Sequence, residues 1–290
     1  MRKIKSGVYG LNSLIDGGLN EYSTTVVIGC AGAGKTTFAT QFVRRGLELG
    51  QEAIFVSLDE NKEQIIKEAV EMGWGEILDY LDREQLIFID ASGKEFSTFI
   101  KKELPDFVEE WKGYSARVAI DPLTPVIWAT KDMYERRDMI SFMFKQLRKI
   151  GTILCTLEEH GTQGDLTGEE TIIPMYLADC VIHLRFRPND NPPSRVLKIV
   201  KARSTRHSED AHPYKIIRGL GIVLCSRAKK EPLTTEIPGK LLNELSKYEN
   251  ILPKPMFAKL TKFFKDLRDQ DFKDVDTQEL INSIIEEFKV

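Results

Sequence analysis

A strand, a glycine-rich loop and a helix follow one another in the segment TTVVIGCAGAGKTTFATQF, and no other feature constrains the fold as strongly. The apolar run TTVVIG predicts a buried strand, and KTTFATQFVRRGLEL has the apolar spacing of a helix. Between them, residues 29–36 fit the pattern G-x-x-x-x-G-K-[ST]. A chance glycine turn is the alternative, but a preceding strand and a following helix are the context that a phosphate-binding loop requires.

The small residues of this loop serve its backbone. They let successive N–H groups turn inward into a concave anion-binding nest, and the positive end of the following helix adds to that field. Lys35 can then reach the β- and γ-phosphates, and the Thr36 hydroxyl can ligate Mg²⁺. We therefore expect ATP and Mg²⁺ as ligands. The residues expected to bind the nucleotide are Gly29, Cys30, Ala31, Gly32, Ala33, Gly34, Lys35, Thr36 and Thr37.

Nucleotide hydrolysis also needs a carboxylate near the metal, and ARVAIDPLTP supplies Asp121 at the end of a predicted strand. The carboxyl end of a parallel strand faces the crevice where ligands bind in such sheets. We predict that Asp121 is the metal-side acid beside Thr36 and that it acts through a Mg²⁺-bound water. The alternative is that Asp121 begins a turn.

A second strand end, AIFVSLDENKEQ, carries Asp59 and Glu60. Adjacent carboxylates repel each other, which raises at least one pKa and suits a general base. Alternatively, the two carboxylates complement the positive N-terminal end of the next helix. Both roles can coexist.

The remaining cationic run is LKIVKARSTRHSEDAHPYKI, in which Lys201 and Arg203 alternate and so share one face as a strand ends. A solvated charged edge is the ordinary explanation. The phosphate-loop segment, however, supplies no arginine directed at the γ-phosphate. An arginine finger from a neighbouring subunit would fill that gap.

Apolar runs alternate with segments of helical period through about residue 184, which implies βαβ units and a parallel sheet covered on both faces. Beyond that point SRVLKIVKAR, YKIIRG and GIVLCS predict a β-meander at the sheet edge. The predicted fold class is therefore α/β. The candidate parallel strands are Thr25–Ile28, Ala53–Leu58, Leu86–Ile89, Arg117–Ile120, Thr152–Thr156 and Cys180–Leu184.

We predict an α/β domain over residues 1–230 and a helical extension over residues 231–290, with KKEPLTTEIPGK as the break. Two amphipathic helices follow it, and Asp276 with Glu279 resembles a capping box before the second. These helices either cover a face of their own domain or contact a partner or another subunit.

Composition indicates a soluble, cytoplasmic chain. Its 290 residues are 42% hydrophobic and 29% charged, no apolar run approaches the ~18 residues of a membrane span, and the start MRKIKSG lacks a signal-peptide apolar region. The four cysteines form no C-x-x-C pair, so we expect neither a cysteine metal site nor a disulfide framework. The net charge of −3 lies in residues 231–290, and the neutral remainder gives no indication of nucleic-acid binding.

Several phrases in the right order resemble the KaiC-like branch of the RecA/RadA ATPase superfamily, from about Ile4 to Cys225. They are SGVYGLNSLIDGGLNEYSTTVVIG, MGWGEILDYLDREQLIFIDAS, YLADCVIHLRF and KARSTRH…HPYKI. The resemblance implies a RecA-like P-loop NTPase core that forms rings, commonly hexamers, with ATP held between subunits.

The resemblance also assigns residues. It places Lys35, Thr36 and Asp121 at the phosphate-loop and Mg²⁺ positions, and Lys201 with Arg203 at the trans-acting γ-phosphate pair. The chain departs from the pattern where Asp59–Glu60 stands for the usual Glu-Glu, Ser204 for glycine, and Asn12–Ser13 for Leu-Asp. Glu158 in TLEEH falls at the strand-end sensor position.

The leading functional hypothesis is a ring-forming ATPase whose slow hydrolysis switches its contacts with a protein partner. The alternatives are a DNA-handling RadA-like recombinase paralogue or motor, and an ATP sensor with negligible turnover. The segment TGEETIIPMYLAD does not reproduce the hydroxyl-bearing segment that serves as phosphoacceptor in the circadian clock protein of this family. Neither a circadian clock nor autokinase activity is therefore predicted.

Overall fold

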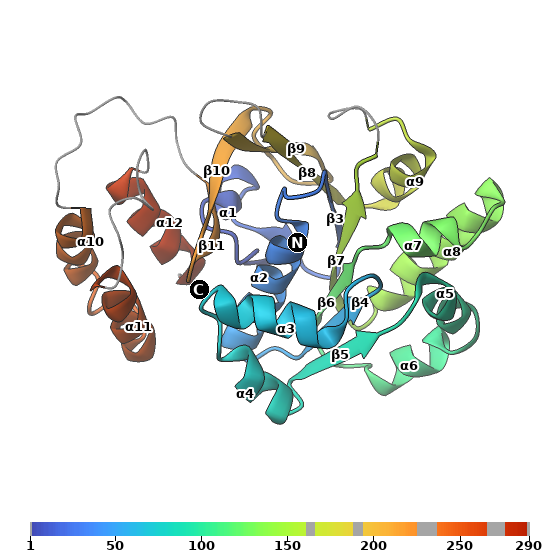
Figure 1. Cartoon of the computed structure of the whole chain (residues 1–290), viewed down its shortest axis with the longest axis horizontal. Helices are drawn as coiled ribbons and strands as arrows, with labels where there is room; N and C mark the ends of the chain where they lie inside the picture. The colour runs from blue at the N-terminus through green and yellow to red at the C-terminus, as the bar shows by residue number, and fades with distance from the viewer. Residues whose placement is uncertain (1, 161–165, 188–193, 225–236, 266–275, 289–290) are drawn as a thin grey trace.

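One mixed sheet of nine strands organises the chain (Figure 1). The computed structural model describes residues 2–160, 166–187, 194–224, 237–265 and 276–288. The strands of this sheet are β3 (Thr24–Gly29), β4 (Ala53–Ser57), β5 (Leu86–Asp90), β6 (Ala116–Asp121), β7 (Gly151–Glu158), β8 (Cys180–Arg187), β9 (Ser194–Ala202), β10 (Ala211–Ile217) and β11 (Gly221–Leu224). Their spatial order is β11-β10-β9-β8-β3-β7-β6-β4-β5. A separate two-stranded sheet joins β1 (Lys3–Ile4) to β2 (Leu19–Asn20).

The six strands from β8 to β5 run parallel, as the alternation of apolar runs and helices predicts. Five of the six are buried along most of their length, because helices cover both faces of such a sheet. The strands from β8 through β11 pair antiparallel with their chain neighbours, so the predicted edge meander is confirmed. An α/β fold with a mostly parallel central sheet is therefore established.

Two cores lie on the two faces of this sheet, and successive strand residues alternate between them. Val27 packs in one core, whereas Val26 and Ile28 pack in the other. The first core is covered by α2 (Lys35–Glu48), α3 (Lys62–Glu71) and α4 (Ile77–Asp82), and it also takes in α1 (Leu11–Leu14). The second is covered by α5 (Gly93–Lys102), α6 (Leu104–Glu110), α7 (Thr124–Trp128), α8 (Met133–Leu147) and α9 (Glu169–Leu177).

The segment STFIKKELPDFVEEWKG, whose apolar residues recur at helical spacing, belongs to two helices, α5 and α6. Ser92 begins α5 with a complete capping box to Glu95. Pro105 lies in the first turn of α6, where its missing N–H costs no helical hydrogen bond. Proline thus starts a second helix here, and the chain bends at Glu103.

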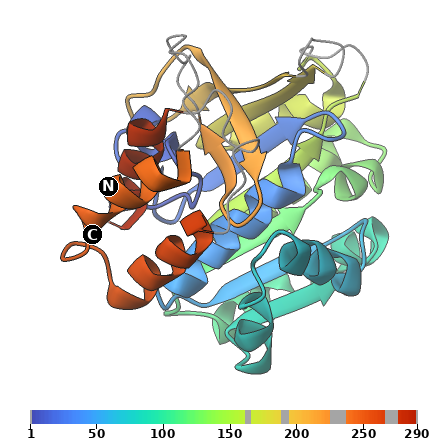
Figure 2. The same ribbon diagram turned by 60° about the vertical axis from the view of Figure 1, so that its left-hand side comes forward.

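The C-terminal helices pack against the meander. These are α10 (Ile237–Ser246), α11 (Lys254–Lys265) and α12 (Thr277–Phe288), and Figure 2 shows them beside the β10–β11 hairpin. Their apolar faces form a third core with residues of the body, including Tyr9, Ile217 and Val223. They therefore cover a face of their own chain. The predicted domain boundary at residue 230, like Cys225, lies outside the described residues.

Candidate functional site

The glycine-rich loop has a backbone that only small residues allow. Gly34 precedes α2 with φ 91°, and a Cβ there would lie 2.7 Å from Ile216 Cδ1. Lys35 is the first residue of α2, as expected, and its Nζ donates a hydrogen bond of 3.2 Å to the Cys30 carbonyl oxygen. The start of a 14-residue helix and the half-buried Lys35 side chain therefore lie together at the loop.

The sheet brings the other predicted acids to the same edge. Gly29 at the end of β3 pairs with Glu158 at the end of β7, and Ser57 at the end of β4 pairs with Asp121 at the end of β6. Since β3, β7, β6 and β4 are consecutive neighbours, these four carboxyl ends form one row. This row is the crevice where parallel sheets bind ligands.

Asp121 lies in this crevice with only 4% of its surface exposed. Burial raises the pKa of the Asp121 carboxyl, while hydrogen bonds from the Thr156 and Thr36 hydroxyls and the charge of Lys35 lower it. The Asp121 carboxylate and the Thr36 hydroxyl together supply hard oxygen donors, the kind of ligand that Mg²⁺ binds. In the described part of the chain no three His, Cys, Asp or Glu side chains form a metal site. Mg²⁺ commonly needs only one or two carboxylates beside substrate phosphates.

Asp59 and Glu60 follow β4 and are exposed at the mouth of the crevice. The pKa of the Glu60 carboxyl is raised by partial burial first, then by Glu68, Asp121 and Asp59. The neighbouring aspartate thus contributes, as the adjacent carboxylates predict, but it is the smallest of these causes. The helix-capping role belongs to Asn61 instead, whose side chain accepts a 2.9 Å hydrogen bond from the Gln64 N–H.

Lys201 and Arg203 do not join this group. Lys201 pairs with Val181 at the start of β8, which is the opposite end of the sheet from the loop. Its Nζ donates to the Met175 and Tyr176 carbonyl oxygens at 2.8 and 3.1 Å, and Arg203 donates to Tyr176 at 2.9 Å. Both cations therefore share one face, as their alternation predicts, and within one chain they cap the C-terminus of α9.

Ser204 adopts φ 54°, a left-handed conformation. Glycine reaches this region without strain, whereas other residues are less stable there. This conformation gives a physical reason for the glycine that the sequence resemblance expects at this position.

A cavity of about 410 Å³ opens beside the first turns of α2. Thr36, Thr37 and Thr40 line one wall, α3 lines another, and Trp74 and the end of β10 close it. Tyr214 of β10 donates a 2.5 Å hydrogen bond to the Ala33 carbonyl oxygen, so the meander contacts the loop directly. Sequence reasoning predicted Thr36, Thr37 and Ala33 but missed Trp74 and Tyr214. The pairing of β9, β10 and β11 in chain order places Tyr214 here, and no local motif marks it.

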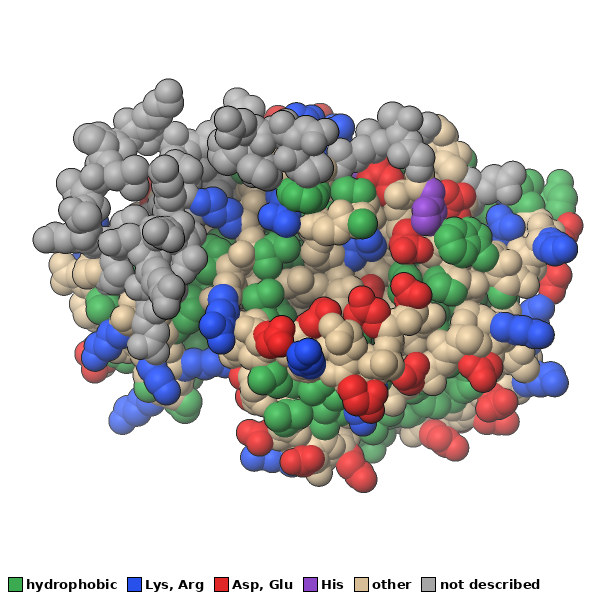
Figure 3. Space-filling model, viewed as in Figure 1, with side chains coloured by type: hydrophobic (Ala, Val, Ile, Leu, Met, Phe, Trp, Pro, Cys, Tyr) green, Lys and Arg blue, Asp and Glu red, His purple; other side chains and the backbone are tan. Residues whose placement is uncertain are grey.

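Acidic side chains gather on the face of the molecule that carries α3 (Figure 3). Glu63, Glu68 and Glu71 of α3 are exposed there, as are Asp59 and Glu60 beside them. The mouth of the crevice is therefore negative outside the loop itself.

A parallel sheet, a phosphate-binding loop after β3 and an acid at the end of β6, which is separated from β3 by β7 alone, define a RecA-like P-loop NTPase domain. The chain belongs to the KaiC ATPase family, whose model matches residues 4–229. The sequence resemblance to this family is confirmed. The match ends before the described C-terminal helices.

Similar proteins share this domain. The circadian clock oscillator protein KaiC of Thermostichus vulcanus is 30% identical over 241 residues, which cover 77% of this chain and 44% of that protein. This chain thus spans less than half the length of the clock proteins that it matches. A UPF0273 protein of Methanopyrus kandleri is 28% identical, over 74% of this chain and 89% of that protein. The crystal structure of a KaiC-like protein from Pyrococcus horikoshii has a TM-score of 0.64 and 28% identity, over 77% of this chain and 98% of that one.

Proposed function

We propose that this protein binds ATP with Mg²⁺ at the carboxyl edge of the sheet and hydrolyses it. One observation carries the proposal: Thr36, which follows the loop and Lys35, is hydrogen-bonded to the buried Asp121 carboxylate and also lines a cavity of about 410 Å³. A nucleotide has a phosphate end that needs positive charge and a base that needs space. The two regions adjoin at Thr36 and Thr37.

In this proposal the loop N–H groups and Lys35 bind the phosphates, and the cavity holds the base and ribose. Thr36 and Asp121 hold Mg²⁺, which when bound neutralises charge that develops on the phosphates. Glu60 accepts the proton of the attacking water, because its raised pKa makes it a better base than an ordinary glutamate. Glu158, at the end of β7 beside Gly29, is positioned to sense the γ-phosphate.

The proposal extends to assembly. A ring of copies would bring the far end of one sheet to the loop of the next copy, so that Lys201 and Arg203 serve a neighbour's nucleotide. Hydrolysis would then switch contacts with a protein partner. Membership of the KaiC ATPase family supports this arrangement. The proposal specifies the partner only as a protein.

Two alternatives predict different responses. A DNA-handling motor should hydrolyse ATP faster with single-stranded DNA and bind it with strong salt dependence. The exposed acids around the crevice disfavour that class. A nucleotide sensor should bind ATP without turnover, an outcome that Asp59 in place of glutamate keeps open.

Phosphate release measured with purified protein tests the proposal. Turnover that requires both ATP and Mg²⁺ and does not respond to single-stranded DNA is the expected result. Tight ATP binding with no phosphate release in a single-turnover assay would identify a sensor. Stimulation by DNA would identify a motor, and absence of ATP binding would overturn the proposal altogether.

A further inference from the structure

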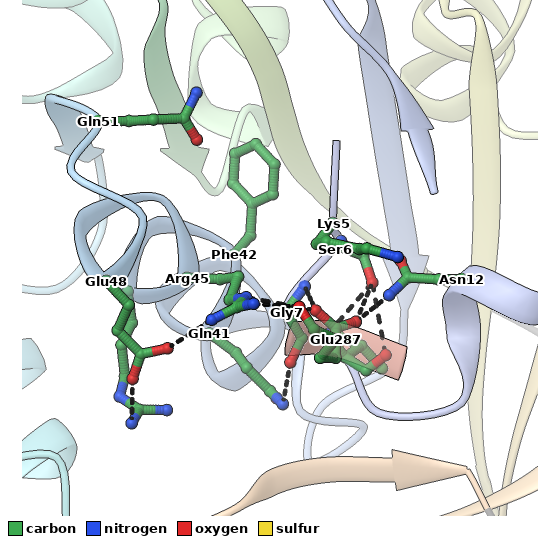
Figure 4. Close-up of polar contacts among 12 residues, drawn as sticks. Lys5, Ser6, Gly7, Asn12, Gln41, Phe42, Arg45, Glu48, Gln51 and Glu287 are labelled. Atoms are coloured by element: carbon green, nitrogen blue, oxygen red, sulfur yellow. Dashed lines mark hydrogen bonds and ion pairs between the residues drawn. The ribbon is translucent and has the colours of Figure 1, made fainter. Parts of the chain in front are cut away.

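The last turn of the chain's final described helix carries a buried carboxylate. Glu287 of α12 has 1% of its surface exposed, and its carboxylate accepts hydrogen bonds from the Gly7 N–H at 3.3 Å and from the side chain of Asn12 (Figure 4). The Ser6 hydroxyl lies at 3.5 Å. Three groups of the N-terminal segment thus converge on one residue that is about 280 positions away in the sequence.

The helix that begins at the phosphate loop, α2, contacts the same turn of α12. Arg45, in the last turn of α2, places Nε 3.5 Å from Glu287 Oε2 and donates a hydrogen bond to the Glu287 carbonyl oxygen. Its guanidinium also lies 3.9 Å from the centre of the Phe288 ring. Lys35 and Arg45 are ten residues apart, so α2 connects the loop to this contact over about 15 Å.

A second connection runs through the meander. Gln41 of α2 donates hydrogen bonds to the carbonyl oxygens of Gly7 and Leu220 at 2.6 and 3.0 Å, and accepts one from the Ile222 N–H at 2.8 Å. Leu220 packs in the third core with α10–α12. In the same hairpin, Tyr214 in the middle of β10 contacts the loop. The C-terminal helices are therefore tied to the phosphate loop by two routes.

The surroundings of Glu287 show that burying its carboxylate costs free energy. Burial raises the pKa of the Glu287 carboxyl to about 7, against the opposing effects of Arg45, Arg117 and Lys5. Arg117 is itself fully buried, and Glu287 is the first of the acids that support its charge, ahead of Glu48. Because the Glu287 carboxylate is desolvated when α12 is docked, α12 is released more easily than it would be if an apolar side chain of the same size made this contact.

We propose that α12 is a releasable latch, closed by Glu287 on the N-terminal segment and on the last turn of α2, and that latch closure and nucleotide binding stabilise each other. The inference rests on the proposed function, because the nucleotide at the loop is one of its two ligands. The latch segment lies beyond the residues that match the family. By linkage, the factor by which nucleotide closes the latch equals the factor by which latch closure raises nucleotide affinity.

Hydrogen exchange of the full chain, with and without Mg²⁺ and a non-hydrolysable ATP analogue, measures the latch without any substitution. We expect the amides of α12 to exchange more slowly with nucleotide, and Glu287→Ala to remove this protection. Calorimetry on the same variant should give an affinity lower by about 5- to 150-fold. Glu286→Gln, on the neighbouring and less buried residue, is the matched control and should leave both quantities unchanged.

The two proposals fail in different ways. If the wild-type protein binds no nucleotide in calorimetry, the proposed function is wrong. If it binds nucleotide but α12 exchanges at the same rate in both states, the latch is wrong. Should Glu287→Ala fail to fold, the wild-type exchange comparison still decides, and Glu287→Gln provides a milder substitution with nearly the same shape.

Discussion

Lys35 and Lys201 lie at opposite ends of the central sheet. Lys35 follows the carboxyl end of β3, whose last residue, Gly29, pairs with Leu184. Lys201 pairs with Val181, three residues earlier in β8, which is roughly 10 Å of strand. Its ammonium group is bonded to the end of α9. If Lys201 assists hydrolysis, a second copy of the chain must supply it.

Lys35→Ala should abolish ATP binding and leave the fold intact. Lys35 is half-buried, and the polar contact described for its ammonium group is with the carbonyl oxygen of Cys30 in the loop. The substitution therefore removes phosphate-binding charge without opening a core. Calorimetry should show no binding heat while thermal unfolding is unchanged. Unaltered affinity would reject the assignment of the loop.

Glu60→Gln should stop hydrolysis and spare nucleotide binding, because the amide cannot accept the proton of the attacking water. Asp59→Asn should have the milder effect, since Asp59 then acts only through its charge. Single-turnover phosphate release at saturating ATP compares the two. If Asp59→Asn is the more damaging substitution, the two roles are reversed.

The pH profile offers a test of how these acids interact. A base must be deprotonated, so activity should fall as pH drops through the raised pKa of Glu60. Asp59 contributes to that shift, and Asp59→Asn removes a neighbouring negative charge. The pKa of Glu60 should therefore move back toward its ordinary value, and the acid limb of kcat should move to lower pH. An unmoved limb, or one that moves upward, would contradict the assignment.

Gly46→Ala should destabilise the protein although alanine is the better helix former. A Cβ at Gly46 would lie 2.4 Å from Arg117 Cδ, inside the core under α2. Arg117 cannot move aside freely, because it donates hydrogen bonds to Gln51, Lys5 and Phe42. Overpacking of this kind costs about 1–3 kcal/mol. Denaturant unfolding measures the loss, and a gain in stability would mean that the space exists.

The control for that substitution is Gly75→Ala. A Cβ at Gly75 meets no atom within 4 Å, and its φ is not positive. Its free energy of unfolding should stay within about 0.5 kcal/mol of wild type.

Local sequence predicted the parts of the fold that local physics determines. The run from Thr24 to Glu48 specifies a strand, a loop and a helix within one continuous segment, so β3 and α2 appear where expected. Asp121 was also predictable, because the end of a parallel strand has a known position relative to the loop.

The parts that sequence could not predict depend on contacts between distant residues. Tyr214 reaches the loop only because β9, β10 and β11 pair in order beyond β8. Glu287 appears in the sequence as one of two adjacent acids near the end of an amphipathic helix, a position where charges are usually solvated. Its burial follows from the packing of α12 on the N-terminal segment, which no periodicity encodes.

Catalysis between copies is the central claim, and mixing two inactive variants tests it most directly. Arg203→Ala should bind ATP almost normally but hydrolyse it poorly, since an arginine finger contributes about 10³–10⁵ in rate. Lys35→Ala lacks the loop charge but keeps Arg203. Copies that assemble at random would place some intact loops beside intact arginines.

The decisive measurement is therefore steady-state ATP hydrolysis across a titration of Arg203→Ala against Lys35→Ala at constant total protein. We predict activity that rises above both pure variants, passes through a maximum at intermediate ratios and stays below the wild-type rate. A flat line at the level of the separate variants would contradict the claim, because it would mean that no copy completes the site of another.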